Sequence, residues 1–185
     1  VIKTIIDANL KINICKYVDK ALKLLPIQRD CAQEVNEFFI QRLIILLSEK
    51  YNKNVLEACA VKNPLFDLSD YLKRTEIVKD LNSVQLLENA NRVARIVKDA
   101  QTGQINPQYL TLQAEKGLYN AVSATEFKGD YRLYSDSLEK LNPVVTKFFD
   151  DVLVMDNDEN IKNNRLALLG LLKEKYDYLT DFSKL

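Results

Sequence analysis

The last quarter of the chain begins with the stretch NPVVTKFFDDVLVM (residues 142–155) and continues as DNDENIKNNRLALLGLLKEKYDYL (residues 156–179). Apolar side chains recur in both parts at intervals of three and four positions, which is the period of an amphipathic α-helix. Asn142-Pro143 places a capping side chain directly before a proline at the first helical position, a good start signal. The pattern therefore predicts two helices, over residues 143–154 and 158–180, joined by an acidic turn.

The rest of the chain has the same helical character. Only four Gly and four Pro occur in 185 residues, and this scarcity of helix breakers disfavours a turn-rich β-sandwich. Asn13 and Ser83 are suitable N-caps, and Gly103 is a suitable stop for the helix that Ser83 begins. The periodicity predicts further helices over residues 13–25, 31–51, 54–61, 67–81, 83–101, 113–127 and 130–141. The expected fold is all-α, a bundle of about eight or nine helices that forms a single domain over residues 1–185.

Several classes of function are disfavoured by what the sequence lacks. The chain contains no His, which excludes Ser-His and Cys-His nucleophilic pairs and His metal ligands. Its three Cys have no CxxC spacing, so we expect no metal site, and a Gly-rich phosphate loop is missing. We therefore expect this segment to have no catalytic residues and to bind no cofactor of its own.

The composition also indicates where the protein works. An odd number of cysteines in apolar helical patterns is typical of reduced thiols in a cytoplasm. No apolar run approaches the ~20 residues of a membrane span. Because the chain begins at Val1 without a leader sequence, we expect it to be a fragment of a longer protein.

Charge suggests a local rather than a global interaction with nucleic acid. Lys and Arg number 26 and so do Asp and Glu, so any RNA contact must come from a local patch. In the helix predicted over residues 83–101, Asn91, Arg95 and Lys98 lie opposite the apolar face, with Arg92 to one side. Guanidinium groups bind phosphate oxygens bidentately. This face is either an ordinary solvated helix face or an RNA contact.

Arg165 falls within the apolar stripe of the last predicted helix. A buried arginine needs an acidic partner, and Asp150, Asp151 or Asp158 could supply it across the helical hairpin. Arg165 is therefore either one member of an internal ion pair or a contact to RNA at the mouth of the hairpin. The acidic turn at residues 156–159 is expected to cap the last helix, and its charge would repel phosphate.

The C-terminal strings FFDDVLVM (148–155), NNRLALL (163–169) and DFSKL (181–185) resemble the C-terminal end of the β subunit of bacterial two-subunit glycyl-tRNA synthetase. Upstream, ANRVARI (90–96) and EKGLYNA (115–121) are similar to segments of the same family, so the resemblance extends over essentially the whole chain and is most specific over residues 142–185. Gly117 and Asp151 depart from it, since the family often has Ala and Asn there.

The resemblance implies a DALR-type anticodon-binding domain in an enzyme of two α and two β subunits. It implies that the α subunit activates glycine with ATP and Mg²⁺, that the β subunit contributes recognition of tRNA-Gly, and that neither DNA nor a membrane is a partner. The enzyme would work in the bacterial cytoplasm. The tRNA-binding candidates are Asn91, Arg92, Arg95, Lys98, Asn164 and Arg165.

Two alternatives stay open. This segment could be a structural or subunit-contact domain of the same enzyme, without direct readout of the anticodon. It could also be the equivalent domain of arginyl-tRNA synthetase, although the DFSKL ending argues against that.

Overall fold

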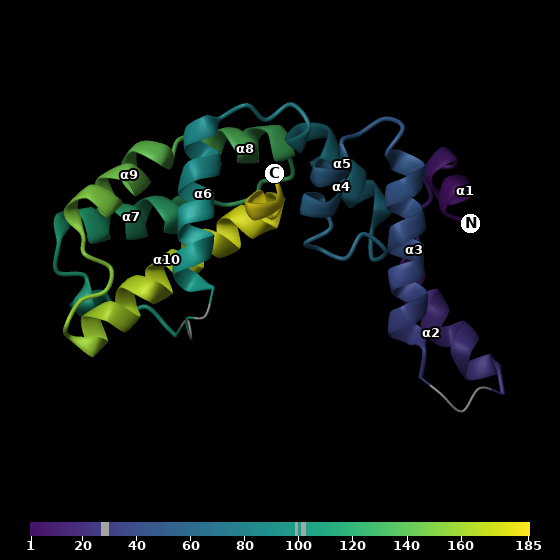
Figure 1. The fold of residues 1–185 in the computed structure, drawn as a ribbon, viewed down its shortest axis with the longest axis horizontal. Coiled ribbons are helices and arrows are strands. Elements are labelled where there is room, and N and C mark those ends of the chain that lie inside the picture. Colours follow the sequence, from purple (N-terminus) through teal and green to yellow (C-terminus); the bar gives the residue numbers. More distant parts are fainter. Residues whose placement is uncertain (27–29, 99, 101–102) are drawn as a thin grey trace. The chain divides into compact units, whose positions relative to one another are not determined.

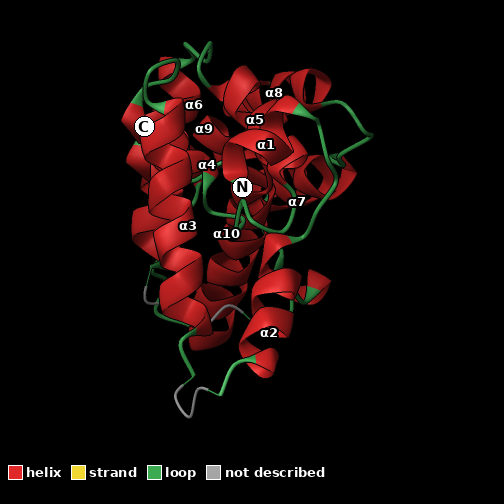
Figure 2. Ribbon diagram, turned by 90° about the vertical axis from the view of Figure 1, so that its right-hand side faces the viewer, coloured by secondary structure: helices red, strands yellow, loops and turns green. Residues whose placement is uncertain are grey.

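The computed structural model describes residues 1–26, 30–98, 100 and 103–185. The chain divides into two compact units, Val1–Asp80 with Lys184 and Leu81–Ser183 with Leu185. Within the described residues the regular structure consists of α-helices and short 3-10 turns, with no strand (Figure 1 and Figure 2). The all-α prediction is thus confirmed, whereas the single domain over residues 1–185 stays a prediction.

Among its described residues, the first unit contains five helices, of which α3 is the longest. Their bounds are α1 Ile2–Asp7, α2 Ile14–Leu24, α3 Ala32–Leu47, α4 Lys53–Cys59 and α5 Leu68–Val78. Helix α3 packs against α1, α2 and α4, and α4 packs against α5. Asn13 caps α2 as predicted, because its Oδ1 accepts a hydrogen bond of 3.0 Å from the Lys16 backbone N–H. Helix α1 has no counterpart among the predicted helices.

The second unit contains the remaining α-helices and a 3-10 turn. Their bounds are α6 Val84–Val97, η1 Pro107–Tyr109, α7 Gln113–Ala124, α8 Tyr131–Glu139, α9 Asn142–Asp151 and α10 Glu159–Leu179. A further 3-10 turn, η2, spans Phe182–Lys184. Helix α6 ends at Val97, earlier than predicted; residues 99 and 101 of its predicted last turn lie outside the described residues.

Helix α10 is the centre of the second unit. It packs against α6, α7, α8 and η1, and in Figure 1 α6 crosses it. Every residue from Asn164 to Gly170 is buried. A helix buried on all sides in its middle has no polar face there, so Asn164 and Arg165 are inside the protein although the helix begins and ends at the surface.

Helix α9 begins differently from the prediction. Asn142 is its first residue rather than its cap, and Leu141 occupies the N-cap position. The Asn142 side chain is buried, and its Oδ1 accepts a hydrogen bond of 3.1 Å from Nδ2 of Asn89 on α6. The Asn142 side chain therefore links α9 to α6 and does not cap its own helix.

None of the described helices combines the length and the apolar character required to cross a bilayer.

Candidate nucleic-acid interface

Helix α6 presents a cationic face. Ser83 begins the helix by accepting a hydrogen bond of 3.4 Å at Oγ from the Leu86 backbone N–H. Leu86, Ala90, Val93 and Val97 are buried on the inner side of the helix. The opposite side carries Arg92, Arg95 and Lys98, three residues apart and all exposed, with Asn91 half-buried beside them. We call Arg92, Arg95 and Lys98 the α6 cation row.

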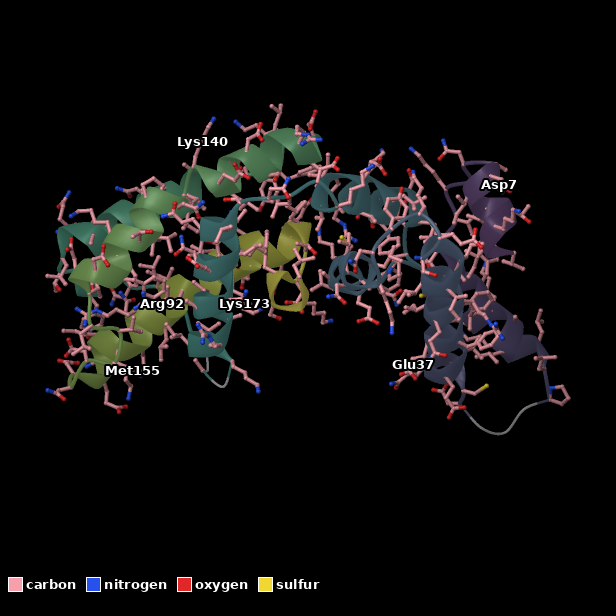
Figure 3. The ribbon with its side chains drawn as sticks, turned by 45° about the horizontal axis from the view of Figure 1, so that its top comes forward. Asp7, Glu37, Arg92, Lys140, Met155 and Lys173 are labelled. Atoms are coloured by element: carbon pink, nitrogen blue, oxygen red, sulfur yellow. The ribbon has the colours of Figure 1, made fainter. Side chains whose placement is uncertain are left out.

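The Arg92 side chain is exposed, but a contact with another helix holds its guanidinium in place. Figure 3 labels Arg92. Its guanidinium carbon lies 4.0 Å from the ring centroid of Phe149 on α9, a cation–π contact between the two helices. Stacking uses the flat face of the guanidinium and leaves its in-plane N–H groups able to donate to a phosphate. A positioned arginine loses less conformational entropy on binding than a freely rotating one.

Arg95 is held only loosely. Its Nε donates to the Asn91 backbone carbonyl across 3.4 Å, a long and weak hydrogen bond within α6. Arg95 and Lys98 are exposed charges on the surface, which suits contact with a phosphate backbone.

Asn164 is placed very differently from the α6 cation row. It is 4% exposed, and its Oδ1 accepts a hydrogen bond of 2.7 Å from the Asn106 backbone N–H. Asn106 in turn caps η1, since its own Oδ1 accepts from the Gln108 backbone N–H at 3.0 Å. The amide nitrogen of Asn164, Nδ2, is buried without a hydrogen-bond partner in the part of the chain that the structure describes. A buried donor in this state destabilises the fold unless a ligand or water satisfies it.

A pocket of about 330 Å³ opens beside Asn164, between η1 with the chain before it and the first turns of α10. We call it the Asn164 pocket; it is lined by Gly103, Gln104, Asn106, Tyr109, Asn160, Asn163, Asn164 and Leu166. Its described lining has five amide side chains and one phenol but no ionisable acid or base of the Asp, Glu, Lys or Arg type. Such a surface can form hydrogen bonds with a neutral polar group.

Arg165 is one member of an internal ion pair. Its Nε lies 2.5 Å from Oε1 of Glu115 on α7, and its Nη1 lies 2.6 Å from Oδ2 of Asp156. Nη1 also donates to the Leu153 carbonyl at 2.9 Å. The internal-pair interpretation is therefore confirmed, and its guanidinium is engaged inside the protein. The role of Arg165 as a direct tRNA contact stays a prediction, as does that of the other five candidates.

The predicted acidic partners of Arg165 were wrong. Asp151 instead pairs with Lys147, with 2.8 Å between the charged atoms, and Asp150 is exposed. Asp158 caps α10, accepting hydrogen bonds from the Asn160 and Ile161 backbone N–H groups at 2.8 and 3.3 Å. The acidic turn thus caps the helix as expected, but its first residue, Asp156, also binds Arg165.

Glu115 is the residue that sequence reasoning missed. It is fully buried, and besides Arg165 its carboxylate accepts a hydrogen bond of 2.7 Å from the Leu112 backbone N–H at the start of α7. A Glu at the third helical position commonly reaches back to the N-cap in this way. That position could have marked Glu115 as the cap of α7, but not as the partner of an arginine on another helix.

The segment that carries these features is similar to a known family. Residues 68–176, from the first residue of α5 to the last turn of α10, match the DALR anticodon binding domain. The chain belongs to the DALR anticodon-binding domain family. All six candidate residues, the α6 cation row and the Asn164 pocket lie within the DALR match.

Curated relatives extend the similarity beyond the DALR match. The β subunit of glycine–tRNA ligase from Thermodesulfovibrio yellowstonii is 31% identical, over 93% of this chain and 26% of its own length. The corresponding proteins of Neisseria gonorrhoeae and Ralstonia nicotianae are 34% and 31% identical, over 82% and 100% of this chain. These alignments cover 24% and 29% of the two relatives. The chain therefore spans about a quarter of the length of the curated relatives it matches.

Among the described residues, no group of three or more His, Cys, Asp or Glu side chains is arranged so that it could hold a metal ion.

Proposed function

We propose that this chain is the anticodon-binding part of a glycyl-tRNA synthetase β subunit and holds the anticodon stem-loop of tRNA-Gly. The observation that carries the proposal is the combination of the α6 cation row with a neutral polar pocket on α10, inside a segment that matches the DALR family. Because α6 and η1 both pack against α10, one helix supports both surfaces. Phosphate contacts would set the position of the RNA, and contacts to base edges would set the specificity.

In this proposal, the residues that catalyse aminoacylation lie outside this chain. A chain without His, and spanning about a quarter of its relatives, would supply recognition while a separate α subunit activates glycine with ATP and Mg²⁺. The two subunits would assemble as two α and two β chains in the bacterial cytoplasm. No cofactor is required by the residues of this chain.

A second role is favoured by the first unit. An apolar groove of about 750 Å³ lies between α1, α2 and α3, lined among others by Ile12, Tyr17, Leu25 and Phe39. Tyr17 and Leu25 are more than half exposed. An open apolar groove suits contact with protein rather than RNA, so the first unit would be a structural or subunit-contact element.

The test is a titration of the assembled enzyme with tRNA-Gly transcript and with the same transcript carrying a changed anticodon, each at two salt concentrations. Tighter binding to the native anticodon, weakened by salt, is the expected result. Equal affinity for both transcripts would overturn anticodon recognition and leave the subunit-contact role.

A further inference from the structure

We propose that the Asn164 pocket receives a single unpaired nucleobase of RNA, and that Nδ2 of Asn164 donates a hydrogen bond to an acceptor on the edge of that base. This inference rests on the proposed function, because it names the part of the RNA that the pocket would hold. It concerns a site on η1 and α10 rather than the α6 cation row.

The orientation of the Asn164 amide is fixed by the protein. Its Oδ1 accepts from the Asn106 backbone N–H at 2.7 Å, so the amide cannot turn over without losing that bond. Nδ2 is buried and without a partner among the described residues, and Asn164 is one of the residues that line the pocket. A donor held in this way is ready for an acceptor that arrives with a ligand, and a carbonyl oxygen or ring nitrogen of a base supplies one.

The lining of the pocket indicates a neutral ligand. Amides of Gln104, Asn160 and Asn163 accompany Asn164, and the ring of Tyr109 supplies a flat apolar surface. Phosphate would require cations, and the described lining has none, whereas Arg92, Arg95 and Lys98 are exposed on α6. A neutral planar group with a hydrogen-bonding edge, stacked on an aromatic ring, fits this surface.

The size of the pocket limits the ligand to one base. About 330 Å³ is at the lower end of the range for small-molecule sites, so it admits one planar ring system and not a stack of nucleotides. Because an RNA helix hides its base edges in stacked pairs, the base must come from a loop.

The experiment uses the assembled enzyme and an anticodon stem-loop RNA in which each loop nucleotide is replaced in turn by an abasic nucleotide. The key variant is Asn164→Asp, which keeps the oxygen that accepts from Asn106 and replaces the Nδ2 donor by an acceptor. Asn120→Asp on α7 is the matched control, since it adds the same charge at an exposed position outside the pocket.

The expected result is one loop position at which removal of the base weakens binding to the wild type about tenfold, the order of one hydrogen bond, and does not weaken binding to Asn164→Asp further. The control is expected to behave as the wild type. Tyr109→Ala removes the stacking surface and should abolish the effect at the same position. This second variant decides the matter if Asn164→Asp fails to fold, because Tyr109 is exposed.

Three outcomes overturn the proposal and are distinguishable. If the wild type binds the stem-loop in a salt-dependent way but every abasic substitution has the same effect in all the variants, the pocket holds no base and the proposed function stands. If the wild type does not bind the stem-loop, both fail. Loss of subunit assembly in Asn164→Asp, with unchanged RNA binding, would assign the pocket to a protein side chain instead.

Discussion

Arg165 on α10 and Glu115 on α7 lie fifty positions apart in the sequence and form a buried ion pair with 2.5 Å between Nε and Oε1. The exposed fractions of the two side chains are 5% and 0%. Because Arg165 also binds Asp156 and the Leu153 carbonyl, one guanidinium joins α7, α10 and the turn between α9 and α10. Desolvation offsets much of the attraction in such a pair, but removal of one member leaves a buried charge without its partner.

Replacement of Glu115 by Gln is therefore expected to lower the free energy of unfolding by about 3–5 kcal/mol. Urea denaturation measures the change. The matched control is Glu159→Gln, which removes an exposed partner of Lys162 at 2.7 Å and should cost less than about 1 kcal/mol. If both variants lose a similar unfolding free energy, the buried pair contributes no more to stability than the exposed pair does.

Low pH is expected to weaken the interaction between Asp156 and Arg165. The pKa of Asp156 lies below its ordinary value of 3.8, because the Asp158 backbone N–H and then the Arg165 guanidinium donate to its carboxylate. A lowered folded-state pKa means that the charged form is favoured in the folded protein. Its contribution to stability is complete above the unfolded pKa and disappears as the pH falls through the folded value.

The measurement compares the wild type with Asp156→Asn by urea denaturation between pH 7 and pH 2. The difference in unfolding free energy should be constant down to about pH 4.5 and shrink below that. A difference as large at pH 2 as at pH 7, or one that changes near neutral pH, would contradict this assignment.

Two glycines should respond to Ala in opposite directions. Gly117 lies within α7, and a Cβ there would meet only Cγ1 of Val144, at 4.0 Å, an ordinary contact. Gly117→Ala should stabilise the protein by about 0.5–1 kcal/mol, because it reduces the freedom of the unfolded chain. Gly129 has a φ of +89°, so Gly129→Ala should destabilise by about 1 kcal/mol or more.

The midpoint of thermal unfolding, measured for the wild type and both glycine variants, tests these two expectations. A lower midpoint for Gly117→Ala than for the wild type would mean that α7 and α9 are too close for the added methyl group.

The α6 cation row should be visible in the salt dependence of tRNA binding. Substitution of Arg92 or Arg95 by Ala is expected to reduce the slope of log affinity against log salt by about 1 for each phosphate that the variant no longer neutralises. Arg92→Lys should retain the charge but bind more weakly than the wild type, because Lys cannot stack on Phe149 in the same planar way.

The control for this series is Arg132→Ala, which removes an exposed arginine at the start of α8. An unchanged slope is expected. If Arg132→Ala lowers the slope as much as Arg92→Ala does, binding is a diffuse effect of surface charge and α6 does not touch the RNA.

Local signals in the sequence predicted the helices well. The same signals do not predict when a capping side chain bonds to another helix instead. Asn13 and Ser83 cap α2 and α6 as expected, because capping involves atoms only three residues away. Asn142-Pro143 was interpreted in the same way, but the Asn142 side chain bonds to Asn89 instead. The equivalent pair Asn106-Pro107 does cap a helical turn, η1, which was not predicted.

The candidate site required contacts that no local pattern contains. Arg165 was correctly placed inside the protein, because it interrupts an apolar stripe. Its partner Glu115 is fifty residues away, and the backbone N–H that holds Asn164 is fifty-eight residues away. Periodicity assigns a residue to a face of its own helix, whereas these contacts depend on how α10 packs against α7 and η1.

The continuous burial from Asn164 to Gly170 affects how members of this family can be recognised from their sequences. An ordinary surface helix tolerates amino-acid substitution at most of its exposed positions. The positions that must stay apolar are therefore separated from one another along the chain. In the middle of α10 every one of seven consecutive positions is enclosed, and each change there alters a packed interior. A short uninterrupted run of residues in this helix is then the expected signature of the domain, and, apart from Asn164, it reports the packing of the core rather than the identity of the RNA that the surface binds.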